Sequence, residues 1–372
     1  MSTAARAACA VGAPPPSPEN VVAEVGQHTM LQSLFPYVEK KMHQLVKDRP
    51  WAQIVVRGSY VRSGGAVAAD CEKSDKMFNW HRPTATQLDA DTLALNCFPG
   101  LAYTEHYAGL VRTYLALSGR DASVVRCVRP RPDQCAALFA QSNLRQMGRA
   151  DIVLIGYVYQ LERVSATDWT GRGDGNLFAW QKTRLDSGLT VAYLECMVSF
   201  WGDIAGHLTR ALQRYAGLKC LIFIGKAGSL RPDKQPNEWI VSGERSHMGD
   251  AVVAWPNVLA PELDGLASVE VGDIATVDSP LCESLDWLRQ WQPRCSWVDC
   301  EIGHMALASR QAGTDFAYLN LISDNVAGSY NENLANEDAS TIRHKRELLF
   351  RQVDLILTAF LDRYPGGTEP RA

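Results

Sequence analysis

The sequence lacks the long apolar runs and the strong charge bias that mark membrane proteins and nucleic-acid-binding proteins. No apolar stretch approaches the ~20 residues that a membrane-spanning helix needs. The formal net charge of -4 provides no basic field to attract nucleic acid. The first residues, MSTAARAACAVGAPPPSPEN, also lack the basic start and apolar core of a secretory signal. We therefore expect a soluble globular protein with neither membrane nor nucleic-acid partners.

Paired cysteine motifs are missing as well. The ten cysteines are scattered along the chain and none has CxxC spacing, which argues against a zinc knuckle or a thioredoxin-type site. Several, such as Cys196 and Cys220, lie within apolar stretches, where a thiol packs as a small hydrophobic group. Unpaired buried thiols are typical of a reducing compartment. We therefore expect a cytoplasmic protein with no metal site and no resident cofactor.

The length of 372 residues predicts more than one structural part. Residues 1–20 are small and rich in alanine and proline, and we expect them to form a disordered tail. Residues 21–150 form an extension of unknown role that is predicted to be mostly helical, with a strand over residues 52–58. Residues 151–364 are predicted to form an α/β domain, and residues 365–372 a second tail.

Short, continuous apolar runs begin at Asp151. They are DIVLIG, LTVAYLECMV, LKCLIFIG, WIVSG, SVEVGDIATVD, CSWVDC and FAYLNLIS. Runs that are short, apolar on both faces and rich in β-branched residues are typical of interior strands in a largely parallel sheet. Between them, DIAGHLTRALQRYAG and EIGHMALASRQAG have apolar residues at helical spacing and end at Gly217 and Gly313. An amphipathic helix is predicted near the end of the chain.

The segment VDCEIGHMALASRQAGTDFAYLNLISDN (residues 298–325) reads as strand, helix and strand, which predicts a βαβ unit. Glu301 follows the first strand and Asp324 the second, so both are expected at the carboxyl edge of the sheet, where open α/β sheets bind ligands. Two acids placed there can hold two parts of one small polar molecule. Each acid also has a structural interpretation. Glu301 is suited to capping its helix, and Asp324 to opening an Asx turn with Asn325.

The segment LIFIGKAGSL adds a glycine-rich turn at the end of another strand. Glycines there allow backbone amides to approach an anion or a ribose closely. The spacing fits neither a Walker A loop nor a GxGxxG fingerprint.

Taken together, these segments resemble the nucleoside phosphorylase and nucleosidase superfamily, which includes purine nucleoside phosphorylase, uridine phosphorylase and methylthioadenosine nucleosidase. The segments that match its motifs are IGKAGSL (224–230), NEWIVSGE (237–244), IATVDSPL (274–281), VDCEIGHMA (298–306) and ISDN (322–325). Their order and spacing agree with the superfamily over residues 151–364. Residues 1–150 lie outside the resemblance.

The resemblance implies a three-layer α/β/α fold around a twisted, mixed, largely parallel sheet. It also implies cleavage of the N-glycosidic bond of a purine nucleoside-like substrate by a homo-oligomer. Glu301 would hold the ribose hydroxyls, Cys300 would pack against the sugar, and Asp324 would protonate the leaving base at N7. The other substrate-binding residues that it implies are Gly225, Lys226, Ala227, Gly228 and Ser323. The alternative is a protein that binds or stores a nucleoside or nucleotide on the same fold without cleaving it.

The sequence departs from the superfamily at the positions that bind the attacking group. Phosphorolytic relatives begin the domain with a Gly-Asp-Pro-x-Arg loop, but the first strand here continues as IGYVYQLER. Water and inorganic phosphate, the latter as a co-substrate, therefore both stay open as the attacking group. Glu162 lies one residue beyond the position of the base in nucleosidases, so it is either that base or an exposed loop acid. Lys226 replaces a small neutral residue and either turns outward or faces an anion.

Two more residues and the extension complete the set of candidates. Trp201 either stacks on a base or packs on the sheet edge. His247 follows the strand WIVSG, where relatives place a loop close to the substrate. The extension is a candidate lid over the site.

Overall fold

The structure is a computed structural model and describes residues 18–59, 66–67, 83–173, 175–197, 201–337 and 339–365. Most of the two expected tails therefore lies outside the described residues. Within the first tail, Pro18–Asn20 form one turn of 3-10 helix.

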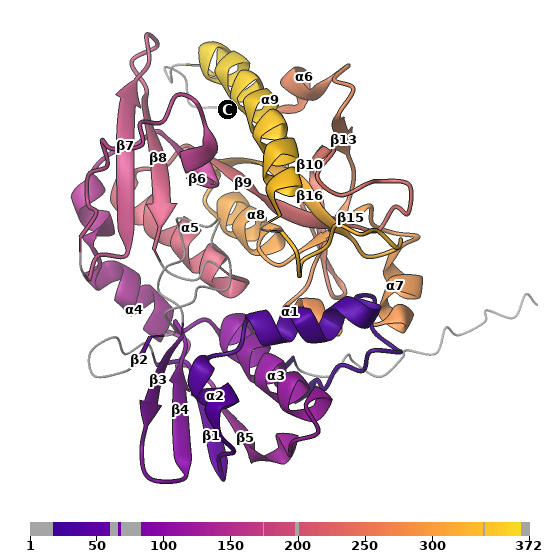
Figure 1. The fold of residues 1–372 in the computed structure, drawn as a ribbon. Helices are drawn as coiled ribbons and strands as arrows, with labels where there is room; N and C mark the ends of the chain where they lie inside the picture. The colour runs from indigo at the N-terminus through magenta and orange to yellow at the C-terminus, as the bar shows by residue number, and fades with distance from the viewer. Residues whose placement is uncertain are drawn as a thin grey trace, which may run out of the picture.

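The N-terminal extension contains a five-stranded sheet with the strand order β2-β3-β4-β1-β5, at the bottom of Figure 1. The strands are β1 (Gln53–Arg57), β2 (Ala66–Val67), β3 (Thr84–Gln87), β4 (Thr92–Asn96) and β5 (Val125–Val128). The helices are α1 (Leu34–Lys40), α2 (Gln44–Asp48), α3 (Leu101–Leu117) and α4 (Gln134–Gln141). Among the described residues of the extension, helical residues outnumber strand residues, as the sequence predicts. Of the five strands, however, the sequence predicts only the first.

The second part of the chain forms an eleven-stranded sheet. Its main path runs β12-β11-β14-β15-β9-β16-β10-β13, and β6 joins β9 to β8 and β7. The strands are β6 (Ile152–Gly156), β7 (Phe178–Arg184), β8 (Thr190–Cys196), β9 (Cys220–Ser229), β10 (Ile240–Ser242), β11 (Arg245–Met248), β12 (Ala251–Ala254), β13 (Val269–Val271), β14 (Ile274–Thr276), β15 (Trp297–Asp299) and β16 (Asp315–Asn325). Most neighbouring strands are parallel, and the antiparallel pairs are β7–β8, β10–β16, β11–β12 and β9–β15. The predicted mixed, largely parallel sheet is confirmed.

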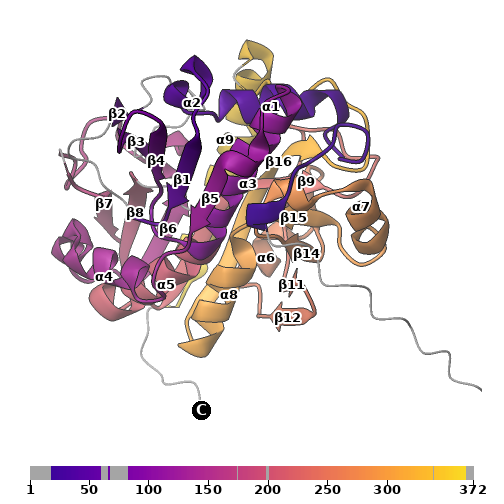
Figure 2. The same cartoon turned by 90° about the horizontal axis from the view of Figure 1, so that it is seen from below.

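Helices cover both faces of this sheet. On one face, α5 (Asp203–Ala216) and α8 (Ile302–Gln311) pack together and share a hydrophobic core with α3, and Figure 2 looks onto these three helices. On the other face, α9 (Ser340–Arg363) packs with α6 (Ala260–Leu263). The predicted three-layer α/β/α arrangement is thus confirmed. Gly217 ends α5 in the left-handed conformation, with φ 68°, as the sequence predicts.

One hydrophobic core joins the extension to the large sheet. Leu34 of α1 and Leu110 of α3 belong to the same buried cluster as Leu208 of α5 and Trp297 of β15. Because these side chains exclude water together, the extension packs against the α/β domain as part of its core.

The predicted βαβ unit is wrong. β15 pairs with β9 in the antiparallel sense, whereas β16 pairs with β9 in the parallel sense. The two strands that flank α8 therefore run in opposite directions. A short apolar run such as CSWVDC specifies a strand but carries no information about its direction.

Two further features bear on the expectations from composition. In the described part of the chain, no helix combines the length and apolar character that crossing a membrane requires. The described cysteines are free thiols, and most of them are buried.

Candidate active site

A cavity of about 150 Å³ opens beside the central strand β9. β6 pairs with residues 220–224 of β9, and β15 pairs with residues 228–229. The residues between these two partners, Gly225–Ala227, line the cavity. Helices α1 and α3 of the extension also contribute to its wall. One water needs only ~10–15 Å³ of such space, so the cavity has room for a small molecule.

Glu301 lines this cavity from the start of α8. Its side chain makes no capping hydrogen bond to the helix. The capping is done by Asp299, whose Oδ2 accepts hydrogen bonds from the amides of Glu301 and Ile302 at 3.0 and 2.7 Å. The structural interpretation of Glu301 as a helix cap is therefore wrong, because a neighbouring acid already satisfies these amides.

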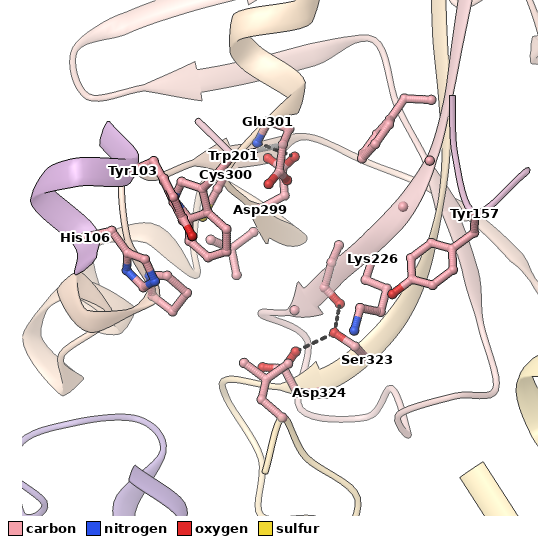
Figure 3. A pocket seen from close by; sticks show the side chains of 18 of the residues that line it. Tyr103, His106, Tyr157, Trp201, Lys226, Asp299, Cys300, Glu301, Ser323 and Asp324 are labelled. Carbon is pink, nitrogen blue, oxygen red and sulfur yellow. Dashed lines mark hydrogen bonds between the residues drawn. The ribbon is translucent and has the colours of Figure 1, made fainter. Parts of the chain in front are cut away.

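Asp324 lines the same cavity from the end of β16, and Figure 3 shows it across the hollow from Glu301. The pairing of β16 with β9 shifts register between Ile322 and Asp324, which is a β-bulge that redirects the side chains around it. Ser323 Oγ lies in this bulge and donates a hydrogen bond to Asp324 Oδ1 at 2.7 Å. The two acids thus reach one cavity although their strands run in opposite directions.

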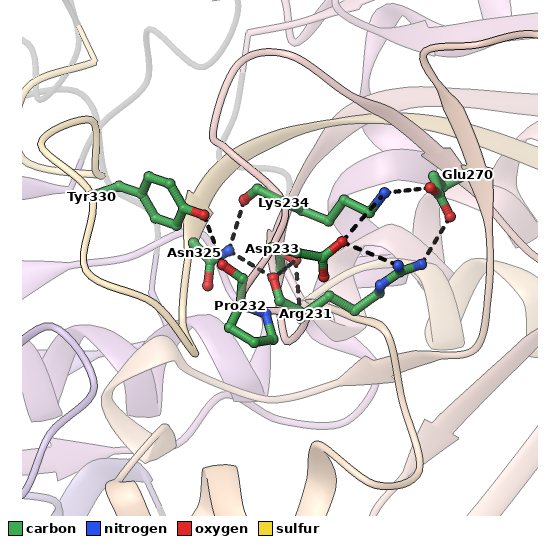
Figure 4. A network of polar contacts seen from close by, with 8 residues as sticks. Arg231, Pro232, Asp233, Lys234, Glu270, Asn325 and Tyr330 are labelled. Atoms are coloured by element: carbon green, nitrogen blue, oxygen red, sulfur yellow. Dashed lines mark hydrogen bonds and ion pairs between the residues drawn. The ribbon is translucent and has the colours of Figure 1, made fainter.

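Asn325, and not Asp324, makes the turn after β16. Its Oδ1 accepts hydrogen bonds from the amides of Ala327 and Gly328, at 2.9 and 2.7 Å. Its Nδ2 donates to the carbonyls of Arg231 and Lys234 at 2.8 and 2.7 Å. Figure 4 shows how Arg231 and Lys234 also pair with Glu270. This network fixes the end of β16, where the adjacent Asp324 lines the cavity.

Residues 225–228 do not form the predicted turn, because β9 continues as a strand to Ser229. β16 pairs with β9 over this whole length, so many of the backbone amides are used in the sheet. Glycine is required at two of the positions by close packing. A Cβ on Gly225 would lie 2.3 Å from the Phe223 ring, and one on Gly228 would lie 2.9 Å from Val326 and 3.4 Å from Asp324 Oδ2.

Lys226 points neither outward nor at an open anion site. Its ammonium group forms an ion pair with Glu337, which is fully buried in the segment before α9. The Arg346 guanidinium of α9 donates a second hydrogen bond to the same carboxylate at 2.8 Å. The anion that Lys226 faces is thus a carboxylate of the same chain, which neutralises its charge.

Trp201 connects the site to the extension. Its ring stacks on His106 of α3, with centroids 4.4 Å apart and planes inclined by 16°. Trp201 Nε1 donates to the carbonyl of Asp278 at 3.1 Å, and His106 Nδ1 lies 2.7 Å from Ser279 Oγ. Trp201 therefore packs against the extension while also lining the cavity next to Tyr103.

Burial shifts the protonation of several groups in the wall. It raises the pKa of Asp299 to about 6, although the amides of Ile302 and Glu301 favour the charged form. Burial also raises the pKa of the Cys300 thiol, and the nearby Glu301 carboxylate adds to this effect. Cys300 is therefore a neutral, apolar contact surface near neutral pH.

Several lining residues escape sequence analysis. Lys41 and His106 belong to the extension, which lies outside the recognisable motifs. Glu283 lies in a short connection between two elements, where no spacing pattern identifies it. It is 5% exposed, and burial raises the pKa of its carboxyl well above the usual range, with a further contribution from Asp324.

Glu162 and His247 do not line this cavity. Glu162 is exposed and its Oε1 lies 3.5 Å from Nε of Arg351 on α9. His247 lies on β11, where its Nε2 is 3.0 Å from an oxygen of Asp273. Each has a partner elsewhere, and the sheet places neither beside Asp324. Within the described ranges, no cluster of three or more His, Cys, Asp or Glu side chains is arranged to hold a metal ion.

No protein-family model matches the chain. Among curated proteins, the oxidoreductase cns1 of Cordyceps militaris is 24% identical over 151 residues, which is 37% of this chain and 18% of that protein. The chain thus spans less than a fifth of the length of this relative.

Similar solved structures include a nucleosidase and a futalosine hydrolase. The 5'-methylthioadenosine/S-adenosylhomocysteine nucleosidase of Colwellia psychrerythraea, in complex with adenine, is 17% identical, with a TM-score of 0.42 over 60% of this chain and 98% of that chain. The futalosine hydrolase of Helicobacter pylori is 14% identical, with a TM-score of 0.43 over 58% of this chain and 98% of that chain. The first belongs to the superfamily that the sequence motifs resemble. At these identities and TM-scores, the likeness assigns no activity to this chain.

Proposed function

We propose that the chain cleaves the N-glycosidic bond of a purine nucleoside-like substrate. The observation that carries the proposal is the placement of two carboxyl groups, Glu301 and Asp324, on opposite walls of one cavity (Figure 3). A nucleoside has two ends with matching chemistry, since its ribose carries hydroxyl donors and its base carries a nitrogen that needs a proton on leaving.

Each acid has a defined part in this reaction. Glu301 accepts hydrogen bonds from the ribose hydroxyls and stabilises the positive charge that the ribosyl group develops. Asp324 donates a proton to the base, so that the base leaves as a neutral molecule. Ser323 Oγ, 2.7 Å from Asp324 Oδ1, holds this carboxyl in place, and Cys300 packs against the sugar.

Water fits the site better than phosphate as the attacking group. Lys226 is already paired with Glu337, and many amides of residues 225–228 are used in the sheet. No arginine is present among the described residues that line the cavity. With Lys226 paired, Lys41 is the other lysine of the described lining, so the site attracts a phosphate ion less than one that holds an arginine. Water needs no such cation, because the ribosyl cation accepts a weak nucleophile.

A second candidate is a protein that binds a nucleoside without cleaving it. The observation in its favour is the position of Glu162 outside the cavity, because this residue was the candidate base for activating water. On this alternative the same cavity holds the intact nucleoside.

Base release separates the two candidates. The protein is incubated with adenosine, inosine, guanosine or methylthioadenosine, with and without phosphate, and the free base is quantified. We expect release without phosphate from at least one nucleoside, and a loss of about 100-fold or more in Asp324→Asn, as for removal of a general acid. Asp362→Asn, which changes an exposed acid of α9, is the matched control. Binding without release would favour the second candidate, and full activity in Asp324→Asn would refute the assigned proton donor.

A further inference from the structure

A second buried acid stands next to the proposed proton donor. Glu283 follows the 3-10 helix Pro280–Cys282 and precedes α7 (Leu285–Trp291). It lines the cavity together with Asp324. Both residues also line an adjoining groove of about 610 Å³ between residues 29–36 and residues 325–336. Glu283 and Asp324 therefore both lie in the wall that separates the cavity from the groove.

The N-terminal segment fixes the position of Glu283. The amide and hydroxyl of Thr29 both donate to the Glu283 carbonyl, at 3.1 and 2.8 Å. His28 forms an isolated antiparallel bridge with Ser284, and its Nε2 lies 3.0 Å from the carbonyl of Pro280. Contacts on both sides of Glu283 therefore hold its backbone against the cavity.

The surroundings of Glu283 favour its protonated form. The residue is 5% exposed, and both burial and the neighbouring Asp324 raise the pKa of its carboxyl. Two carboxyl groups that interact in a region of low dielectric resist ionising together, so one proton is retained by the pair. Glu283 is buried whereas Asp324 is only partly buried, so the more deeply buried acid, Glu283, retains the shared proton.

We propose that Glu283 holds the proton that Asp324 delivers to the leaving base, an inference that rests on the proposed cleavage reaction. When the C–N bond breaks, its electron pair goes to the base. The Glu283 carboxyl passes its proton to Asp324, and Asp324 delivers this proton to the base. Water forms the new C–O bond and loses one proton, which restores Glu283. Nothing is oxidised or reduced. Glu283 acts through Asp324, so it is a positioning residue for the proton.

The first test does not depend on catalysis. The infrared spectrum of the wild-type protein near neutral pH is compared with that of Glu283→Gln, in water and in heavy water. We expect a carbonyl band of a protonated carboxylic acid that shifts in heavy water and is lost in Glu283→Gln. Glu347→Gln, which changes an exposed acid of α9, should retain the band. Identical wild-type and Glu283→Gln spectra would overturn the inference, whatever the activity of the protein.

The second test depends on whether the leaving base needs a proton. A purine nucleoside that the wild type cleaves is compared with its N7-methylated form, whose base is already positively charged and leaves without protonation. We expect Glu283→Gln to lower kcat for the ordinary nucleoside by about 100-fold, with little change in KM, and to leave cleavage of the methylated form nearly unchanged. An equal loss for both substrates would show a structural role. If the wild type releases no base at all, the proposed function fails, and the infrared result still decides whether Glu283 holds a proton.

Discussion

At the scale of single residues, the buried acid Asp299 caps helix α8, and its effect on the stability of the protein depends on pH. Its carboxylate accepts hydrogen bonds from two amides at the start of α8 and from the Thr276 hydroxyl at 2.8 Å. The side chain is nevertheless buried, with only 7% of the residue exposed, and this burial raises the pKa of its carboxyl to about 6. The pKa of Asp299 is higher in the folded state than in the unfolded state. Its contribution to the stability of the fold is therefore complete below the unfolded-state pKa and is lost as the pH rises through about 6.

Asp299→Asn should therefore alter how the free energy of unfolding depends on pH. The asparagine does not ionise, so the wild type should lose stability relative to the variant by up to about 3 kcal/mol between about pH 4 and pH 7. Urea unfolding at a series of pH values measures this difference. Asp264→Asn, at an exposed position, should show little pH-dependent difference, and a flat difference for Asp299→Asn would contradict the account.

Sequence patterns identify the central residues of the site only where a motif surrounds them. The sequence identifies Glu301 and Asp324 because each follows an apolar run within a recognisable motif, and both line the cavity. Counting from Gly156 points to Glu162, but this residue is exposed and lies beside Arg351. Glu283 lies in no motif, and its place in the cavity wall depends on contacts with the distant segment around Thr29.

At the scale of elements, the segment between β16 and α9 sets the charge beside the cavity. Glu337 in this segment is fully buried and binds both Lys226 and Arg346. Removing one partner of a buried ion pair is costly because it leaves an uncompensated charge. The carboxylate also occupies the position in which an anion would otherwise meet the two cations.

Glu337→Gln should therefore destabilise the protein and create affinity for anions. We expect a loss of about 3 kcal/mol in the free energy of unfolding, partly restored by phosphate, which should raise the melting temperature of the variant more than that of the wild type. Melting curves in phosphate and in chloride at equal ionic strength measure the effect. Glu347→Gln is the control. Equal responses of Glu337→Gln and the wild type to phosphate would contradict this role.

Most strands of the large sheet could be predicted, but their directions and the edge strands could not. β6, β8, β10 and β15 fall within predicted apolar runs, and β13 and β14 share one such run, whereas β9 and β16 extend beyond theirs. The apolar pattern does not reveal β7, because the second half of FAWQKTR is largely exposed. It does not reveal β11 and β12 either, because their residues are polar or exposed. The antiparallel direction of β15 depends on its pairing with β9, which the apolar pattern does not encode.

At the scale of the whole molecule, the extension belongs to the body that holds the site. It shares a hydrophobic core with the large sheet, and its residues Tyr37, Lys41, Tyr103 and His106 line the cavity. The sequence could not reveal this, because residues 1–150 carry no recognisable motif and the contacts are made between segments far apart in the chain. A wall of the site is thus supplied by the part whose role the sequence left open.

A shared core predicts that the two parts unfold together. Native-state hydrogen exchange should give similar opening free energies for the amides of β1 in the extension and of β9 in the large sheet, because the same apolar contacts stabilise both. Opening of β1 at a much lower free energy, with β9 still protected, would show that the extension is an independent unit.

The central claim is that Glu301 and Asp324 hold the two ends of one nucleoside. The most direct measurement is a crystal structure of Asp324→Asn with a bound purine nucleoside, in which the variant keeps the substrate intact. The account predicts ribose hydroxyls within hydrogen-bond distance of the Glu301 carboxylate, and the base nitrogen N7 next to residue 324. A nucleoside bound outside this cavity, or bound in the reverse orientation, would contradict it.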